Sequence, residues 1–195
     1  MIRLPQMLLI GSFAKGSGKT TLACELIKRF KFQYKIIAIK ITIVDEQSRL
    51  FHGAQLTGLS ESEKKYLLSK EQDSASNNDT SRLLSAGAQQ AFWLQTTAQD
   101  IMNGFEKLMA DISLNSIIIC ESSSLRNHVE PGLFIITQNQ NSMEVKASAK
   151  KVGKFADKIV SFDGANFDFD IDDIGIVEGK WTLLANHLKD QKSPR

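Results

Sequence analysis

Short apolar runs alternate along the chain with stretches in which apolar residues recur every three or four positions. A short continuous apolar run is typical of a buried strand, and the recurring spacing is typical of a helix with one buried face. The apolar runs predict strands over residues 7–10, 35–43, 90–95, 116–120, 132–137 and 158–162. The spaced patterns predict helices over residues 20–30, 79–85, 98–112, 147–156 and 181–188.

This alternation predicts the fold class. Strands separated by helices, several of them apolar throughout, favour a mostly parallel sheet covered by helices on both faces. We therefore expect a three-layer α/β/α fold in a single domain, because 195 residues with 42% hydrophobic content can bury one sizeable core. Residues 45–80 interrupt the pattern, since they are polar and serine-rich and contain one plausible helix, at residues 61–69. We interpret this stretch as an excursion over the surface.

Composition and charge narrow the range of partners. The chain has 24 basic and 22 acidic residues, and a net charge of +2 is too small to indicate a nucleic-acid or membrane partner. The apolar run at residues 7–10 is too short for a signal peptide or a membrane span. Cys24 and Cys120 lie in apolar segments without metal-ligand spacing, so we expect small core residues in a reducing, cytoplasmic setting.

A glycine-rich motif follows the first predicted strand directly. Residues 11–22 read Gly-Ser-Phe-Ala-Lys-Gly-Ser-Gly-Lys-Thr-Thr-Leu, and a predicted helix continues from them. Such a turn cradles phosphate, because glycines let successive N–H groups turn inward and the helix N-terminus adds partial positive charge. Lys19 is expected to act as the catalytic cation on the terminal phosphates, and Thr20 to offer its hydroxyl to a magnesium ion. The predicted phosphate-binding residues are Lys15, Gly16, Ser17, Gly18, Lys19, Thr20 and Thr21.

The motif departs from the common pattern G-x-x-x-x-G-K-[ST] at one position. Phe13 stands where the pattern has glycine, and Gly11 lies two residues earlier. Because the half that contacts phosphate is kept, we expect a binding site with an altered loop entrance. Two alternatives stay open: a glycine-rich turn that binds nothing, and a solvent-facing rather than a phosphate-binding role for Lys15.

Two carboxylates are candidates for the chemistry around the metal. Glu121 follows the run of isoleucines at residues 116–120, and Asp45 lies just past the second predicted strand. Both are expected at the carboxyl edge of the sheet, where ligands bind in such folds. We expect Glu121 to hold magnesium together with Thr20, and Asp45 to orient a water molecule or the metal. The alternative for each is a strand-end charge that faces solvent.

Three other groups have open interpretations. Asp79 and Arg82, three residues apart on a predicted helix, could form a surface ion pair or belong to the site. His128 lies in the loop after Glu121 and could approach the site or lie on the surface. The acidic stretch at residues 163–173 is interpreted as a solvated edge or loop, with a weak cation site as the alternative.

Several of these segments together resemble the MobB-type family, molybdopterin-guanine dinucleotide biosynthesis protein B, within the P-loop nucleotide-binding proteins. The matching stretches are residues 16–22, the strand ending Ile39-Lys40, the block Asp79-Thr80-Ser81-Arg82…Ala86-Gly87-Ala88, and the strand ending Cys120-Glu121. The resemblance implies a P-loop NTPase fold, nucleotide phosphates at residues 16–21 and magnesium near Thr20 and Glu121. It also implies slow GTP hydrolysis, a homodimer, and a protein partner in cofactor assembly.

The sequence therefore predicts a protein that binds a nucleoside triphosphate with Mg²⁺, hydrolyses it slowly, and assists molybdenum-cofactor or metalloenzyme maturation. One alternative is a P-loop kinase or ATP-dependent ligase that acts on a small molecule, with residues 45–80 as its lid. Another is a nucleotide-binding module without catalysis. GTP and ATP are both open, because residues 137–141 (Thr-Gln-Asn-Gln-Asn) lack the lysine and aspartate of the common guanine-binding motif.

Overall fold

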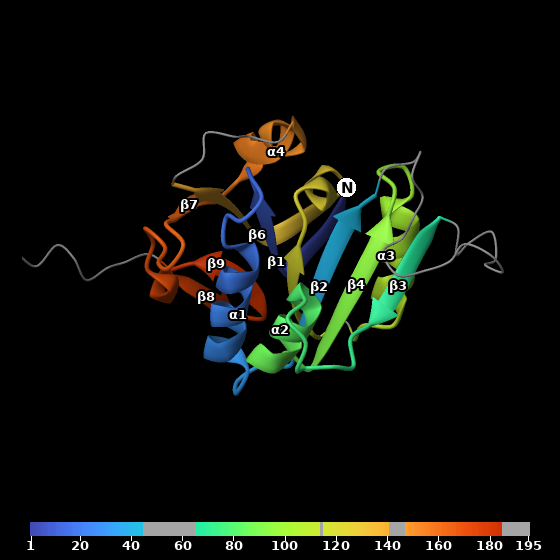
Figure 1. Ribbon diagram of the computed structural model, residues 1–195. Coiled ribbons are helices and arrows are strands. Elements are labelled where there is room, and N and C mark those ends of the chain that lie inside the picture. Colours follow the sequence, from blue (N-terminus) through green and yellow to red (C-terminus); the bar gives the residue numbers. More distant parts are fainter. Residues whose placement is uncertain (45–64, 114, 141–146, 185–195) are drawn as a thin grey trace, which may run out of the picture.

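The chain forms a seven-stranded sheet with helices between its strands, and a separate two-stranded hairpin (Figure 1). The computed structural model describes residues 1–44, 65–113, 115–140 and 147–184. The α/β fold class predicted from the sequence is confirmed.

The described strands are β1 (Ile2–Ser12), β2 (Ile36–Ile43), β3 (Tyr66–Lys70), β4 (Gln90–Thr96), β5 (Ile117–Glu121), β6 (Val129–Asn139), β7 (Lys158–Phe162), β8 (Ile174–Val177) and β9 (Lys180–Leu183). The described helices are α1 (Lys19–Phe30), α2 (Asp79–Ala86), α3 (Ile101–Ala110) and α4 (Ala147–Val152), with 3₁₀ helices η1 (Ser124–Asn127), η2 (Gly153–Phe155) and η3 (Ile171–Asp173).

The sheet is parallel except at one edge. Its strands follow the order β3-β4-β2-β5-β1-β6-β7, and only β3 runs antiparallel to its neighbour. All six strands predicted from apolar runs are present, although β1 and β6 begin earlier than predicted. Because the parallel strands run in one direction, their carboxyl ends form a single edge of the sheet (Figure 1).

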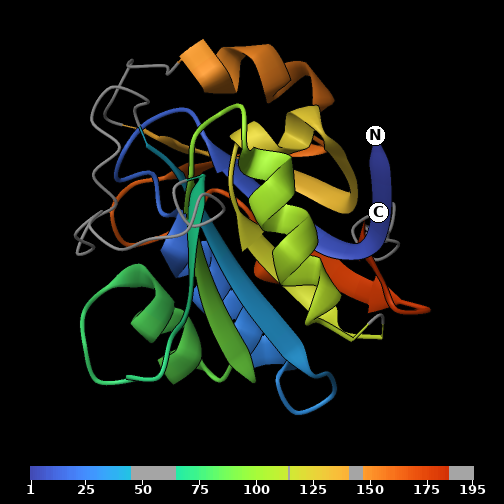
Figure 2. The same ribbon diagram turned by 90° about the vertical axis from the view of Figure 1, so that its right-hand side faces the viewer.

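Each face of the sheet has its own apolar core, because side chains alternate between the faces along a strand. Leu8 of β1 packs in one core with Leu26 of α1 and Leu83 of α2. Its neighbour Leu9 packs in the other core with Phe105 of α3. Figure 2 shows α2 and α3 on opposite sides of the sheet. The helices therefore cover both faces and leave the carboxyl edge of the strands for ligands.

The strand order reverses around β1. After β1 the chain passes through α1 to β2, which lies beyond β5, whereas the chain after β5 crosses to β6 on the other side of β1. In open α/β sheets, such a reversal leaves a crevice at the carboxyl ends of the strands, and ligands bind there. The end of β1 is thus the position at which this fold favours a binding site.

The helix predicted at residues 61–69 is wrong where the structure describes it. Residues 66–70 form β3, which pairs antiparallel with β4, and residues 61–64 lie outside the described residues. Tyr66 and Leu68 pack against the core under α3. A short segment gains little from helical hydrogen bonds alone, so the pairing offered by the edge of β4 decides its conformation.

The terminal helix predicted at residues 181–188 is also wrong over its described part. Residues 180–183 form β9, the second strand of a hairpin with β8, and residues 185–188 lie outside the described residues. Trp181 is 1% exposed, and its ring packs edge-on against Phe30 of α1 at 5.4 Å between centroids. The buried indole of Trp181 extends the core on the α1 face. Because side chains alternate between the two faces of a strand, β9 can bury this residue without being helical.

The remaining helix predictions are confirmed, those at residues 20–30 and 79–85 within one residue of their predicted bounds and the other two with shorter bounds. The helix at residues 79–85 is α2, where the Asn78 side chain accepts a hydrogen bond from Ser81 N at 2.8 Å and Gly87 ends the helix in the left-handed conformation. The helix at residues 98–112 is shorter, as α3, and that at residues 147–156 is α4 followed by η2. Cys24 and Cys120 are buried and free, as predicted.

Candidate functional site

The connection between β1 and α1 has a backbone that only glycine adopts readily. We name residues 13–18 the glycine loop. Gly16 and Gly18 have φ angles of 72° and 82°, in the left-handed region. The ring of Phe162, at the end of β7, lies against Gly18 so closely that a Cβ there would be 2.7 Å from a ring carbon. Both the backbone conformation and the available space therefore require glycine at position 18.

The backbone amides of this connection are available to a ligand. The first helical hydrogen bond of α1 runs from Leu22 N to Gly18 O, at 2.9 Å. Within the described residues, the amides of Gly16, Ser17, Gly18, Thr20 and Thr21 have no acceptor. The first turn of α1 contains no acidic residue, so the partial positive charge of its N-terminus is not offset by its own side chains. A run of unpaired N–H groups at a helix N-terminus is an anion-binding arrangement.

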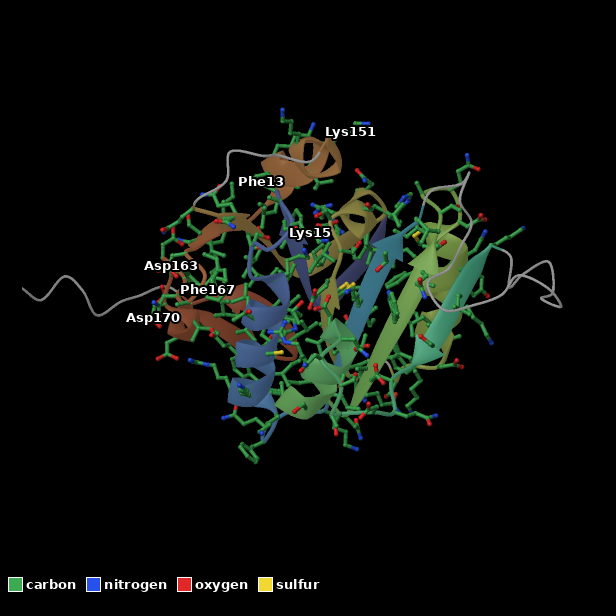
Figure 3. All side chains as sticks on the ribbon, in the orientation of Figure 1. Phe13, Lys15, Lys151, Asp163, Phe167 and Asp170 are labelled. Carbon is green, nitrogen blue, oxygen red and sulfur yellow. The ribbon has the colours of Figure 1, made fainter. Side chains whose placement is uncertain are left out.

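Side chains anchor the glycine loop to the sheet. Ser17 is 1% exposed, and its hydroxyl donates to Ala14 O at 3.0 Å and lies 2.9 Å from Thr137 Oγ1 of β6. Phe13 N donates to Thr137 O at 3.0 Å, and the Phe13 ring lies against Gly153. Phe13 therefore lies just past the end of β1 beside α4 and η2 (Figure 3), and the altered loop entrance expected from this residue stays a prediction.

The side chain of Lys19 lies at the carboxyl edge of the sheet, beside the end of β1. Its Nζ donates to Ser12 Oγ at 2.8 Å, across the mouth of the glycine loop. Lys19 begins α1, so its ammonium and the unpaired amides lie on the same wall of one cavity. This wall gathers positive charge and hydrogen-bond donors for an anionic ligand.

Glu121 lies where the sequence predicted it, at the carboxyl end of β5. It is 3% exposed, so the alternative of a solvent-facing charge is wrong. Its Oε2 accepts a hydrogen bond of 3.0 Å from Thr20 Oγ1, and its Oε1 is buried without a partner among the described residues. Burial raises the pKa of Glu121 to about 7, and the charge of nearby Lys19 opposes this rise.

The oxygen atoms of Thr20 and Glu121 fit a magnesium ion. Mg²⁺ prefers hard oxygen ligands and is commonly held by one or two carboxylates together with substrate phosphates. The unpartnered Glu121 Oε1 beside the Thr20 hydroxyl provides such donors. The described residues contain no group of three or more His, Cys, Asp or Glu that could hold a metal by themselves. A magnesium ion here would therefore depend on phosphate oxygens for part of its coordination.

The cavity at this edge has a volume of about 710 Å³. One side is the glycine loop with the first turn of α1, and the floor is Glu121 with the serines that follow it. The other side consists of residues 40–43 of β2 with Asp79 and Arg82 of α2. Lys15, which is exposed, and Thr21 line the cavity as well, and their phosphate-binding roles stay predictions. The cavity thus extends beyond the glycine loop onto β2 and α2.

Lys40 is a cavity residue that sequence reasoning did not select. Its ammonium forms an ion pair with Asp79, and it lies over the Trp93 ring at 5.7 Å from the centroid. Arg82 Nη1 lies 3.8 Å from the same carboxylate, so the ion pair expected on α2 is present and lies in the site. Burial alone would raise the pKa of Asp79, but the hydrogen bond and the charge of Lys40 hold it below its ordinary value. Lys40 is the sole charged residue of the apolar strand β2, a signal that could have identified it.

Two other candidates do not join this site. Asp45 lies outside the described residues, so its predicted role stays a prediction. His128 does not line the cavity, and its carbonyl accepts from Ile2 N at the start of β1, so of the two alternatives left open for it the approach to the site is wrong. The chain crosses from the end of β5 through η1 to the start of β6, and this crossing takes His128 away from Glu121.

The acidic stretch at residues 163–173 is an exposed segment, as predicted, with η3 at its end. Asp163, Phe167 and Asp170 lie on the β7 side of the sheet, at the opposite end from β3 (Figure 3). Asp163 Oδ1 accepts from two backbone amides at 2.7 Å, and Asp168 Oδ1 accepts from Ser161 N at 2.6 Å. These carboxylates stabilise turns and cover the outer edge of β7.

Comparisons of the chain with models of protein families, with curated proteins and with solved structures found no match. In the described ranges, no helix combines the length and apolarity needed to cross a membrane.

Proposed function

We propose that this chain is a P-loop NTPase that binds GTP or ATP together with Mg²⁺ and hydrolyses it slowly. The observation that supports this most directly is the set of backbone amides of Gly16, Ser17, Gly18, Thr20 and Thr21, which have no acceptor among the described residues and lie with the Lys19 side chain at the N-terminus of α1. A carboxylate or a single phosphate would use only part of this wall. A polyphosphate matches its length and its charge.

Different residues of the site would contact the phosphates and the magnesium ion of a bound nucleotide. The amides of the glycine loop and the Lys19 ammonium hold the phosphates and neutralise charge that develops during phosphoryl transfer. Thr20 and Glu121 would hold the magnesium ion, which lowers the charge repulsion between phosphate oxygens when bound. Phe162 packs against Gly18 and leaves no room for a side chain at that position of the loop. Residues 137–141 lack the lysine and the aspartate of the common guanine-binding motif, so the proposal includes both bases.

The biological role that we propose is that of an accessory or adaptor in molybdenum-cofactor or metalloenzyme maturation, acting with a protein partner and as a homodimer. It rests on the resemblance to the MobB-type family at residues 16–22, 79–88 and 120–121. Residues from each of these separate segments line one cavity, namely 16–21, Asp79, Arg82 and Glu121. A slow NTPase fits an adaptor, because hydrolysis can then time the release of a partner.

One observation favours a second candidate, a small-molecule kinase or ATP-dependent ligase. The cavity extends past the glycine loop to residues 40–43 and to α2, so a second molecule could lie beside the terminal phosphate. Lys40 and Arg82 would then face an anionic acceptor.

Phosphate release and transfer separate the two candidates. Purified protein with Mg²⁺ and each nucleoside triphosphate is expected to bind GTP or ATP and to release phosphate slowly, at a rate that small metabolites from a cell extract do not change. Acceleration by the metabolites, with label from the γ-phosphate appearing on one of them, would favour the kinase or ligase. Absence of binding to any nucleoside triphosphate by calorimetry would reject both.

A further inference from the structure

The position of Lys40 follows from the register of three strands. In the parallel ladder, Lys40 of β2 lies directly beside Glu121 of β5 on one side and beside Trp93 of β4 on the other. Residues paired in this way point to the same face, and neighbouring strands lie about 4.8 Å apart. Lys40 therefore belongs to the row of side chains that forms the cavity floor.

Lys40 and Lys19 approach this floor from opposite sides. β5 lies between β1 and β2, so Glu121 is flanked by the glycine loop after β1 and by Lys40 on β2. Lys19 Nζ is held by Ser12 at the end of β1, and the Lys40 ammonium is held by Asp79 of α2. An anion above Glu121 would thus lie between two ammonium groups.

The partner of Lys40 is one that an incoming phosphate can replace. The Lys40 side chain is 26% exposed and that of Asp79 is 35% exposed, so both are accessible from the cavity. Asp79 also lies 3.8 Å from Arg82, which keeps a cation near the carboxylate if Lys40 moves away. A phosphate oxygen carries at least as much charge as a carboxylate oxygen and forms the same charge-assisted hydrogen bond.

We propose that Lys40 is a second phosphate-binding cation, which Asp79 holds in the nucleotide-free protein and which turns to the terminal phosphate when a nucleotide enters. This inference rests on the proposed function, because it needs a polyphosphate on the glycine loop. It assigns Lys40 a direct contact with the substrate and Asp79 a positioning role that acts through Lys40.

A double-mutant cycle tests this exchange without a metal. Nucleotide affinity is measured by calorimetry in EDTA, with whichever of ATP and GTP the wild-type protein binds more tightly. Lys40→Met is expected to weaken binding about 10-fold, and Asp79→Asn to strengthen it about 3-fold, because the phosphate no longer competes with a carboxylate. Lys40→Arg should retain most of the affinity. In the Lys40→Met background, Asp79→Asn should change affinity less than about 2-fold, because Asp79 acts through Lys40.

Other outcomes of the cycle reject the exchange. If Asp79→Asn strengthens binding equally in both backgrounds, the carboxylate acts only as a nearby negative charge, and the proposal is wrong. Wild-type affinity in Lys40→Met would reject it as well. Lys70→Met is the matched control, because Lys70 also lies over an aromatic ring, that of Phe92 at 5.9 Å, but does not line the cavity.

Trp93 provides a readout that does not depend on affinity. Its Nε1 donates to Thr42 Oγ1 at 2.9 Å, and its ring faces the Lys40 ammonium. Nucleotide binding should change the fluorescence of the wild-type protein, and the change should be lost in Trp93→Phe and in Lys40→Met. Binding by calorimetry without this fluorescence change would reject the movement of Lys40 and leave the nucleotide site intact. A wild-type protein that binds no nucleotide in EDTA would reject this inference, and one that binds none with Mg²⁺ either would reject the proposed function as well.

Discussion

Replacing Lys19 by alanine is expected to weaken the binding of GTP or ATP with Mg²⁺ by about 100-fold or more, as measured by calorimetry. The Lys19 ammonium lies beside the unpaired amides of the glycine loop and is held by Ser12 Oγ at 2.8 Å. It is therefore placed to form charge-assisted hydrogen bonds with phosphate at little cost in side-chain order. The amides remain in the variant, so weak binding should persist at high nucleotide concentration.

The control for Lys19 comes from the same helix. Lys28 lies on the exposed face of α1, away from the cavity, and Lys28→Ala removes the same charge from the chain. It should leave affinity within about 2-fold of wild type, since a distant exposed charge is screened by salt. If Lys19→Ala keeps full nucleotide affinity, the assignment of phosphate binding to Lys19 and the glycine loop is wrong. It is also wrong if Lys19→Ala and Lys28→Ala lose nucleotide affinity equally.

The glycine loop and Glu121 were predictable because their signals are local. The spacing of Gly16, Gly18 and Lys19 encodes a strand-to-helix turn within a few residues, and the structure has that turn. Glu121 follows an apolar run, and the end of a buried parallel strand lies at the ligand edge of such a sheet. Neither inference needed knowledge of which strands are neighbours.

Lys40 was not predictable as a site residue, because its position depends on strand order. Lys40 lies beside Glu121 because β2 pairs with β5 in this register. The spacing of residues along the chain does not predict this strand order, since β2 and β5 are far apart in sequence. The same holds for Phe162, whose contact with Gly18 depends on the placement of β7 and its loop.

The two wrong helix predictions have a related cause. Tyr66 and Leu68 lie two residues apart and so share one face of a strand, and β4 offers that strand an open edge to pair with. Trp181 likewise finds a strand partner in β8 and a ring partner in Phe30. In both segments tertiary pairing decides between two conformations that local pattern does not separate.

The second large effect is expected from replacing Glu121 by glutamine, measured on the nucleotide-free protein in EDTA. Burial raises the pKa of Glu121 to about 7 from 4.5, so the folded protein keeps a proton that the unfolded chain releases. The stability from this protonated carboxyl is complete below the unfolded pKa and is lost as the pH rises through about 7. Glutamine does not ionise, so the variant should be roughly 2–3 kcal/mol more stable relative to wild type at about pH 8 than at about pH 5.

Urea denaturation at the two pH values measures this difference, and Glu106→Gln is its matched control because Glu106 lies exposed on α3. The same Glu121→Gln protein should need more Mg²⁺ for nucleotide binding, since it lacks the carboxylate that lies 3.0 Å from Thr20 Oγ1. Both results have one physical origin. The ionised, buried carboxylate of Glu121 destabilises the nucleotide-free protein, and a bound magnesium ion would stabilise that ionised form. The assignment of Glu121 to the metal site would be wrong if wild type and Glu121→Gln showed the same pH dependence of unfolding free energy and the same Mg²⁺ requirement for nucleotide binding.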